Sequence, residues 1–246
     1  MKNYLVGAVR PVSTAWGGWK SQIEENQALQ EHKKYQEMYN ISRASARKFL
    51  SGTWEEIKFV APVLDARLYQ IAQWYAIKEL WFREPCNILF MGADTLFMKP
   101  TEIFDKYDTM RMFNYTDPKT HPEFPHYFND DIRYYPANMD PKVWNIGERC
   151  MNQWFTHKES DWGWGQLIHN YQLWSQGLTV EEIIDPTLAY QGFMYPDYSK
   201  ETGDAYNNCR LEDAKIIHWH GSRGAARTVE MMQAVSNQLQ ISVESI

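Results

Sequence analysis

Two short apolar segments of the chain each lead to a residue that can bind a metal ion. Residues 88–91 lead to Asp94, and residues 215–217 lead to His218. Apolar runs of this length are typical of buried strands, and ligands of open α/β sheets bind beyond the carboxyl ends of such strands. Carboxylate and imidazole groups bind divalent cations such as Mn2+ or Mg2+. The sequence therefore predicts one metal site shared by Asp94 and His218, with His220 as the alternative imidazole.

Each of these residues also has an ordinary structural explanation. Asp94 follows a glycine and an alanine, as an aspartate that caps a turn would. A histidine at the end of a strand is commonly held by hydrogen bonds alone. The presence of two such strand ends in one chain favours the shared site.

Strand and helix signals alternate along the chain, which predicts an α/β fold. We expect strands at residues 4–9, 58–60, 87–91, 111–115 and 215–219. We expect helices after the capping box of Ser21 and Glu24, over residues 65–80, from Thr101, over residues 166–174 and over residues 225–239. Five prolines punctuate residues 117–141, which predicts a long loop of functional importance. Residues 1–246 are predicted to form one domain.

Composition excludes several classes of protein. The 246 residues include 25 lysines and arginines against 31 aspartates and glutamates, so a generic nucleic-acid-binding surface is not expected. No apolar run approaches the ~18 residues of a membrane span. The three cysteines show no C-x-x-C spacing, which fits the reducing cytoplasm. Aromatic residues make up 15% of the chain, which suits a core but also a cleft that stacks on sugar rings or bases.

Four segments resemble the motifs of a known enzyme family, in the family's order. Residues 90–96 resemble the D-x-D segment of GT-A glycosyltransferases, and are nearest to the D-A-D-T-L pattern of the glycogenin-like family 8. Residues 144–147 resemble the F-N-x-G segment, and residues 165–170 resemble D-Q-x-x-x-N. Residues 218–221 resemble the start of the C-terminal H-x-x-G-x-x-K-P-W motif.

The resemblance implies a GT-A fold with a mostly parallel central sheet flanked by helices. It implies an enzyme that moves a hexose from a nucleotide-diphosphate sugar, most often a UDP-sugar, to an acceptor hydroxyl with retention at the anomeric carbon. The acceptor, whether glycan, protein or small molecule, is not specified. The implied cofactor is Mn2+ or Mg2+, with Asp94 and His218 as ligands.

The resemblance also assigns residues to the donor and acceptor sites. The first strand and its loop would hold the nucleobase, the helix before the D-x-D segment would contact the nucleotide, and later segments would line the sugar and the diphosphate. The residues with these implied roles are Val9, Thr14, Arg67, Lys78, Ala93, Asn145 and Gly221. The family's lysine at the diphosphate is missing from this chain, and Arg223 or Arg227 is the candidate that would take its place. Gln166 matches a residue beside the reacting sugar.

The chain departs from the family pattern at three places. Gly92 stands where the family has its first D-x-D aspartate, Gly165 replaces the aspartate of D-Q, and residues 224–226 replace K-P-W. One explanation is a divergent transferase with relocated charged groups; Asp130, Asp131 and Asp161 are the candidate replacements. We predict Asp161 as the carboxylate that Gly165 lacks; the alternative is that Asp161 caps a turn or the helix that follows.

The alternative explanation is an inactive scaffold that binds a sugar or a nucleotide sugar. A metal-dependent nucleotidyltransferase or phosphohydrolase would need a carboxylate pair, which Gly92 removes from this segment; two carboxylates flanking the metal in the structure would make that class a candidate again. If Gly92 has ordinary strand dihedral angles, Gly92→Asp is expected to tighten Mn2+ binding.

Overall fold

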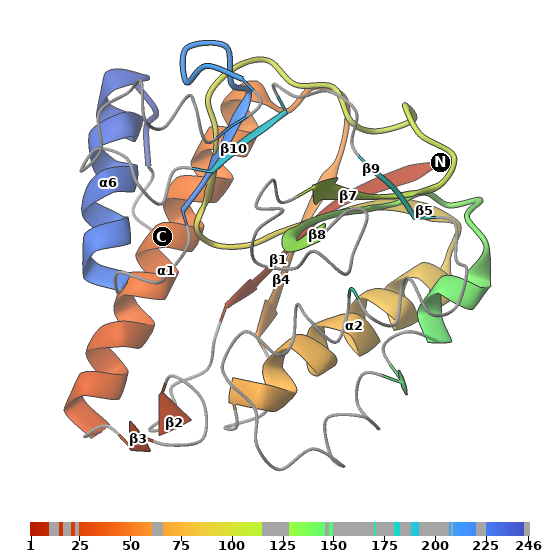
Figure 1. Ribbon diagram of the computed structural model, residues 1–246, viewed down its shortest axis with the longest axis horizontal. Coiled ribbons are helices and arrows are strands. Elements are labelled where there is room, and N and C mark those ends of the chain that lie inside the picture. The colour runs from red at the N-terminus through yellow and green to blue at the C-terminus, as the bar shows by residue number, and fades with distance from the viewer. Residues whose placement is uncertain are drawn as a thin grey trace.

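The structure is a computed structural model with a central six-stranded sheet (Figure 1). It describes residues 1–9, 15–16, 21–22, 25–60, 66–114, 128–145, 148–149, 170, 180–182, 188–191, 207, 209–219 and 225–243. The strand order is β4-β1-β5-β8-β7-β9. These strands are β4 (Glu55–Val60), β1 (Lys2–Val9), β5 (Cys86–Met91), β8 (Phe128–Tyr135), β7 (Met110–Asn114) and β9 (Val180–Glu182).

The central sheet is mostly parallel. Strand β1 runs parallel to β4 and β5, and β7 runs parallel to β9. Strand β8 is antiparallel to both of its neighbours, β5 and β7. The predicted α/β class with a mostly parallel sheet is thereby confirmed.

A second sheet of three strands carries the other half of the predicted metal site. Its order is β10 (Ala189–Gln191), β11 (Ile216–His218) and β6 (Thr95–Phe97). Strand β6 follows β5 after three residues, so the chain passes from the large sheet directly into the small one. A two-stranded ribbon of β2 (Ala15–Trp16) and β3 (Ser21–Gln22) completes the described strands.

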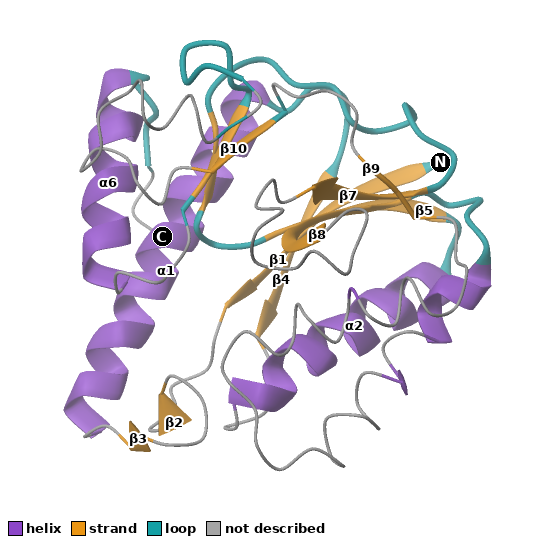
Figure 2. Ribbon diagram, in the orientation of Figure 1, coloured by secondary structure: helices purple, strands orange, loops and turns teal. Residues whose placement is uncertain are grey.

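Helices cover both faces of the large sheet (Figure 2). Side chains alternate between the two faces of a strand, so Tyr4 and Val6 pack with residues of α2 (Ala66–Arg83), while Leu5 packs with residues of α1 (Glu25–Phe49). Helix α6 (Ala225–Gln238) lies beside α1, and a short 3-10 helix, η1, spans Pro141–Trp144. None of the described helices combines the length and the apolar character that a membrane crossing requires.

Two of the predicted features are wrong, and a third lies almost entirely where nothing tests it. No helix begins at Thr101; its backbone N–H donates to Phe49 O, its carbonyl accepts from the Ser51 N–H, and Asp105 has a φ of 61° that a helix would not tolerate. Ser21 lies in β3 rather than at a helix start, since α1 begins at Glu25. The helix predicted over residues 166–174 lies almost wholly outside the described residues.

The predicted loop over residues 117–141 contains a strand. Strand β8 occupies Phe128–Tyr135, and every proline of that segment falls outside it. Because proline cannot donate to a strand ladder, the gap between Pro125 and Pro136 was the signal that a strand fits there. The correction matters for function, since β8 carries Asp131.

Candidate metal centre

Asp94 lies on the turn that joins β5 to β6, beyond the carboxyl end of β5. The Thr95 hydroxyl donates to Gly92 O (2.7 Å), which closes the turn. Helix α1 fixes the turn from one side, since the Arg43 guanidinium donates from Nη2 to Met91 O (2.9 Å). These bonds fix the backbone on which the Asp94 carboxylate depends.

His218 is the last residue of β11 and reaches Asp94 through strand pairing. Strand β11 is antiparallel to β6, with His218 opposite Thr95. The Trp219 N–H donates to Asp94 O (2.9 Å), so the backbones of the two predicted ligands are directly connected. The imidazole is almost fully buried, at 1% exposure.

Asp131 approaches the same point from β8. Strand β8 pairs with β5, and the Gly92 N–H donates to Asp131 O (2.8 Å) at the end of this ladder. On the other side of β8, the register with β7 shifts: Met112 pairs with Arg133, but Phe113 pairs with Asn129. Asp131 lies within this irregularity, and bulges of this kind turn side chains toward functional sites.

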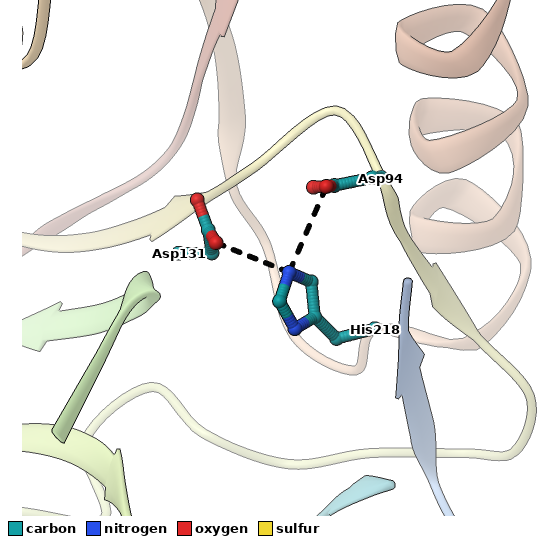
Figure 3. Close-up of side chains that lie close together, drawn as sticks. All are labelled: Asp94, Asp131 and His218. Atoms are coloured by element: carbon teal, nitrogen blue, oxygen red, sulfur yellow. Dashed lines mark ion pairs between the residues drawn. The ribbon is translucent and has the colours of Figure 1, made fainter. Parts of the chain in front are cut away.

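The three side chains converge on one point between the two sheets (Figure 3). His218 Nε2 lies 3.1 Å from Asp131 Oδ2 and 3.7 Å from Asp94 Oδ2. One ligand atom from each residue lies within 4.8 Å of the other two. The Asp94 and Asp131 side chains are 19% and 36% exposed, so the cluster is buried at the imidazole and open to solvent at the carboxylates.

The two carboxylates change the protonation of His218. Burial by itself would lower the pKa of the imidazole, but the negative charges of Asp94 and Asp131, with hydrogen bonds to both, raise the pKa to about 10. Without a bound cation, the imidazole is therefore protonated at neutral pH, and its charge partly neutralises two carboxylates. The cluster attracts a cation.

The cluster fits a divalent ion in both spacing and charge. Adjacent ligands of an octahedral ion at about 2.1 Å are separated by roughly 3 Å, close to the distance from His218 to Asp131. Exchange of the imidazole proton for a dication would balance both carboxylates. Two carboxylate oxygens and one imidazole nitrogen are a donor set that Mn2+ accepts, and Mg2+ uses with additional water ligands. The expectation that Gly92 removes the carboxylate pair is therefore wrong, because Asp131 supplies a second carboxylate from another strand.

Helix α1 contributes polar side chains that the sequence analysis missed. Ser42, Arg43 and Ser45 are all buried, and Ser45 Oγ accepts from the Phe97 N–H of β6 (2.9 Å). They sit on the same helix as the buried Met38 and Ile41. Polar residues within the apolar stripe of a helix were the available signal, because burial requires that such groups find partners.

Four of the residues with implied donor-site roles are described with their side chains. Val9 is fully buried at the end of β1, and Ala93 is nearly buried in the turn before Asp94. Lys78, on α2, forms an ion pair with Glu148 (Nζ to Oε1, 2.6 Å). Asn145 is exposed at the end of η1, and its backbone N–H donates to carbonyls of that helix. Their roles toward a ligand stay predictions.

The other predicted residues lie outside what the structure describes. This holds entirely for Thr14, Asp161, Gln166, His220, Gly221 and Arg223, and for the side chains of Arg67 and Asp130. Asn170, from the segment that resembles D-Q-x-x-x-N, is described and has a structural role. Its side-chain amide accepts from the Phe128 N–H (2.6 Å) and donates to Phe128 O (2.7 Å), which anchors the start of β8.

Among known proteins, similarity to this chain is found in solved structures, and it is a similarity of fold. No protein-family model matches the chain. No curated protein sequence matches it either. Among solved structures, it is similar to a glycosyltransferase involved in the glycosylation of the major capsid of PBCV-1, with 12% identity and a TM-score of 0.51 over 95% of this chain and 100% of the other.

A second solved structure is the galactosyltransferase LgtC in complex with donor and acceptor sugar analogues. It shares 11% identity with a TM-score of 0.49, over 94% of this chain and 95% of the other. The conclusion on fold rests on the first similarity together with the sheet order above. This chain has the α/β fold of GT-A glycosyltransferases, as the sequence predicted.

Proposed function

We propose that this protein transfers a hexose from a UDP-hexose to an acceptor hydroxyl with the assistance of Mn2+ or Mg2+. The observation that carries the proposal is the cluster of Asp94, Asp131 and His218 beyond the carboxyl end of β5, in a chain with the fold of a glycosyltransferase. The motif segments that resemble family 8 support the donor class and retention at the anomeric carbon. A single catalytic domain in the cytoplasm is part of the proposal.

The chemistry explains why such a cluster is useful. The bond between the anomeric carbon and the diphosphate oxygen breaks, the acceptor oxygen bonds to the anomeric carbon, and the proton of the acceptor hydroxyl passes to the departing diphosphate or to water. A dication bound at the cluster would stabilise the negative charge that develops on the departing diphosphate. Asp94, Asp131 and the deprotonated His218 would hold it, and the solvent-exposed carboxylate side leaves room for phosphate oxygens.

Residues inside and outside the described part of the chain complete the proposal. Asp161 orients the acceptor or stabilises positive charge at the anomeric carbon, and Gln166 contacts the reacting sugar. Arg223 supplies positive charge to the diphosphate. Val9 and Thr14 lie along the nucleobase, while Arg67, Lys78, Ala93, Asn145 and Gly221 line the rest of the donor.

The decisive experiment combines a binding screen with turnover. Thermal-shift measurements with UDP, UDP-hexoses and other nucleotide sugars, with and without Mn2+, should show stabilisation by UDP-hexoses that requires the metal. Hydrolysis of the same UDP-hexose without an acceptor then measures catalysis. Metal-dependent binding without any turnover, with or without added acceptors, would support the inactive scaffold instead. If no nucleotide stabilises the protein, the proposed donor class is wrong.

Two substitutions test which residue binds the metal and which residue acts in turnover. Asp94→Asn should abolish metal-dependent UDP binding while the fold is retained, because an amide oxygen is a poor ligand for a hard cation. Asp108→Asn removes an exposed carboxylate on the loop before β7 and is the matched control.

Asp161→Ala should lower kcat by orders of magnitude with little change in UDP affinity, because only a transition-state interaction is lost. A folded Asp161→Ala with full turnover would remove Asp161 from the mechanism.

A further inference from the structure

Position 92 and position 131 are direct neighbours across two strands, and one is a glycine while the other is an aspartate. The Gly92 N–H donates to Asp131 O (2.8 Å), at the end of the antiparallel pairing of β5 with β8. Directly opposite residues in such a pair usually have Cβ atoms about 5 Å apart, but here a Cβ at position 92 would lie only 3.3 Å from Asp131 Cβ. A carboxylate on either residue can therefore reach the same space.

The space beside Gly92 is filled by the metal-site carboxylates. A Cβ added to Gly92 would lie 2.8 Å from Asp94 Oδ1, 3.2 Å from Asp131 Oδ1 and 3.3 Å from Asp131 Cβ. The backbone is not the obstacle, since among the described glycines only Gly52 has a positive φ. A side chain at position 92 would therefore require the Asp94 and Asp131 carboxylates to move, because they already occupy the space that it would enter.

We propose that positions 92 and 131 form one exchangeable ligand position, in which Asp131 supplies the carboxylate from β8 and Gly92 leaves the room for it. The proposal deepens the proposed function, on which it rests for the identity of the metal. Asp131 Oδ2 is the carboxylate oxygen nearest to His218 Nε2, at 3.1 Å against 3.7 Å for Asp94. Asp131 is therefore a direct ligand of the metal rather than a carboxylate that only lies near it.

The same geometry reverses the expectation for Gly92→Asp. The ordinary φ of Gly92 had predicted tighter Mn2+ binding in that variant. With Asp131 in place, the new side chain must displace an existing carboxylate, and it adds a third negative charge around one imidazole. Gly92→Asp alone is therefore expected to lower the melting temperature and to leave Mn2+ binding no tighter than in the wild-type protein.

The test is a reciprocal exchange of the two residues, read by Mn2+ binding without any nucleotide. Four proteins are compared: wild type, Asp131→Gly, Gly92→Asp and the double variant. Free Mn2+ is measured by electron paramagnetic resonance, and folding by circular dichroism and thermal melting. Asp131→Gly should weaken Mn2+ binding by more than ~10-fold. Loss of a residue that only hydrogen-bonds to a metal ligand already has an effect of this size, so the loss of a direct ligand should exceed it. The double variant should recover most of that loss, and it should melt higher than Gly92→Asp.

A second variant keeps the test decisive if a glycine in β8 prevents folding. Asp131→Asn retains the shape of the side chain and should also weaken Mn2+ binding by more than ~10-fold. Asp108→Asn is the control on an exposed carboxylate. A folded Asp131→Asn with wild-type Mn2+ affinity overturns the proposal. So does a folded double variant that binds no better than Asp131→Gly, or a Gly92→Asp that binds Mn2+ more tightly.

Failure of this inference can be told apart from failure of the proposed function. If Asp131 has no effect but Asp94→Asn abolishes both Mn2+ and UDP-hexose binding, only the exchange between positions 92 and 131 is wrong. If the exchange behaves as expected but no nucleotide sugar binds, the metal site stands and the proposed donor is wrong.

Discussion

Two carboxylates share one buried imidazole where β5, β8 and β11 meet, and this arrangement determines how the site responds to pH. The pKa of His218 is raised to about 10 in the metal-free protein, whereas an unfolded histidine titrates near 6.5. When folding raises the pKa of a group, the protonated group stabilises the folded state. This stabilisation is fully present at pH values below the pKa of the unfolded state. It is lost as the pH rises toward the pKa of the folded state. The relevant window is therefore between pH 6.5 and 10.

We predict that the free energy of unfolding of the metal-free protein falls as pH rises through that window. Urea unfolding at several pH values in the presence of a chelator measures it. His218→Gln should flatten this dependence, while His32→Gln, on α1, should retain it. A wild-type profile that is flat between pH 7 and 9 would contradict the ion pairs assigned to His218.

The same proton opposes metal binding. A metal can bind the imidazole only after its proton has left, so Mn2+ affinity should continue to rise above pH 6.5, by up to about tenfold per pH unit. A histidine with its ordinary pKa would give this change near pH 6.5 instead. The two neighbouring carboxylates raise the pKa of His218 and so move this change to higher pH.

At the scale of elements, α1 lies so close to β1 that only a glycine fits between them. A Cβ at Gly7 would lie 2.6 Å from Tyr39 Cε2 and 2.7 Å from Arg43 Nη2. Gly7 is paired with Met91, and Arg43 donates to the Met91 carbonyl just before the metal-site turn. The close approach of helix and strand therefore brings the guanidinium to the end of β5.

Gly7→Ala should lower the free energy of unfolding by about 1–3 kcal/mol, the usual cost of overpacking a filled core. It should also weaken Mn2+ binding, because displacement of Arg43 releases the Met91 carbonyl. Chemical denaturation and Mn2+ titration provide the two measurements. Ala234→Gly, at an exposed position of α6, is a control that perturbs a helix away from this contact. If Gly7→Ala changes neither the free energy of unfolding nor the Mn2+ affinity, α1 and β1 are not packed closely enough to require a glycine.

A second element-scale contact fixes the start of β8. Asn170 is fully buried and makes both of its amide bonds to the backbone of Phe128, three residues before Asp131. Asn170→Ala removes both of these hydrogen bonds from a buried segment, and the loss of one such bond typically costs about 1 kcal/mol.

We therefore expect Asn170→Ala to lower the melting temperature and to weaken Mn2+ binding together. Asn237→Ala, at an exposed position of α6, should change neither. If Asn170→Ala is as stable as wild type, the amide does not anchor β8. If it is less stable but binds Mn2+ normally, Asp131 is positioned by its pairing with β5 alone.

At the scale of the whole molecule, the candidate metal site lies at the junction of the two sheets. Asp131 belongs to the six-stranded sheet, His218 to the three-stranded sheet, and Asp94 to the turn between them. A cation held by all three would link the two sheets through side chains. Metal binding should therefore stabilise the entire fold.

We predict that Mn2+ raises the melting temperature in proportion to the logarithm of its concentration. At a hundred times Kd the gain is about 2.7 kcal/mol, or roughly 5 to 10 °C for a chain of this size. A chelator should reverse the shift, and Asp94→Asn should abolish it. An equal shift in Asp94→Asn would assign the effect to another metal site.

The sequence by itself determined the strands that carry Asp94 and His218, and the α/β class. Residues 87–91 and 215–219 are apolar runs bounded by turn residues, and a local pattern is sufficient to identify a buried strand. The helices at Ala66–Arg83 and Ala225–Gln238 were likewise predicted within a residue at their starts, from a cap and from periodicity. Such signals depend only on neighbours in the chain.

Only the tertiary structure decided which carboxylate completes the site. Asp131 is 37 residues from Asp94 and 87 from His218 in the chain, in a segment with no helical or strand period and many prolines. Its role comes from the pairing of β8 with β5, the register shift beside β7 and the missing side chain at Gly92. These are contacts between distant segments, and their geometry is set by packing rather than by the local sequence.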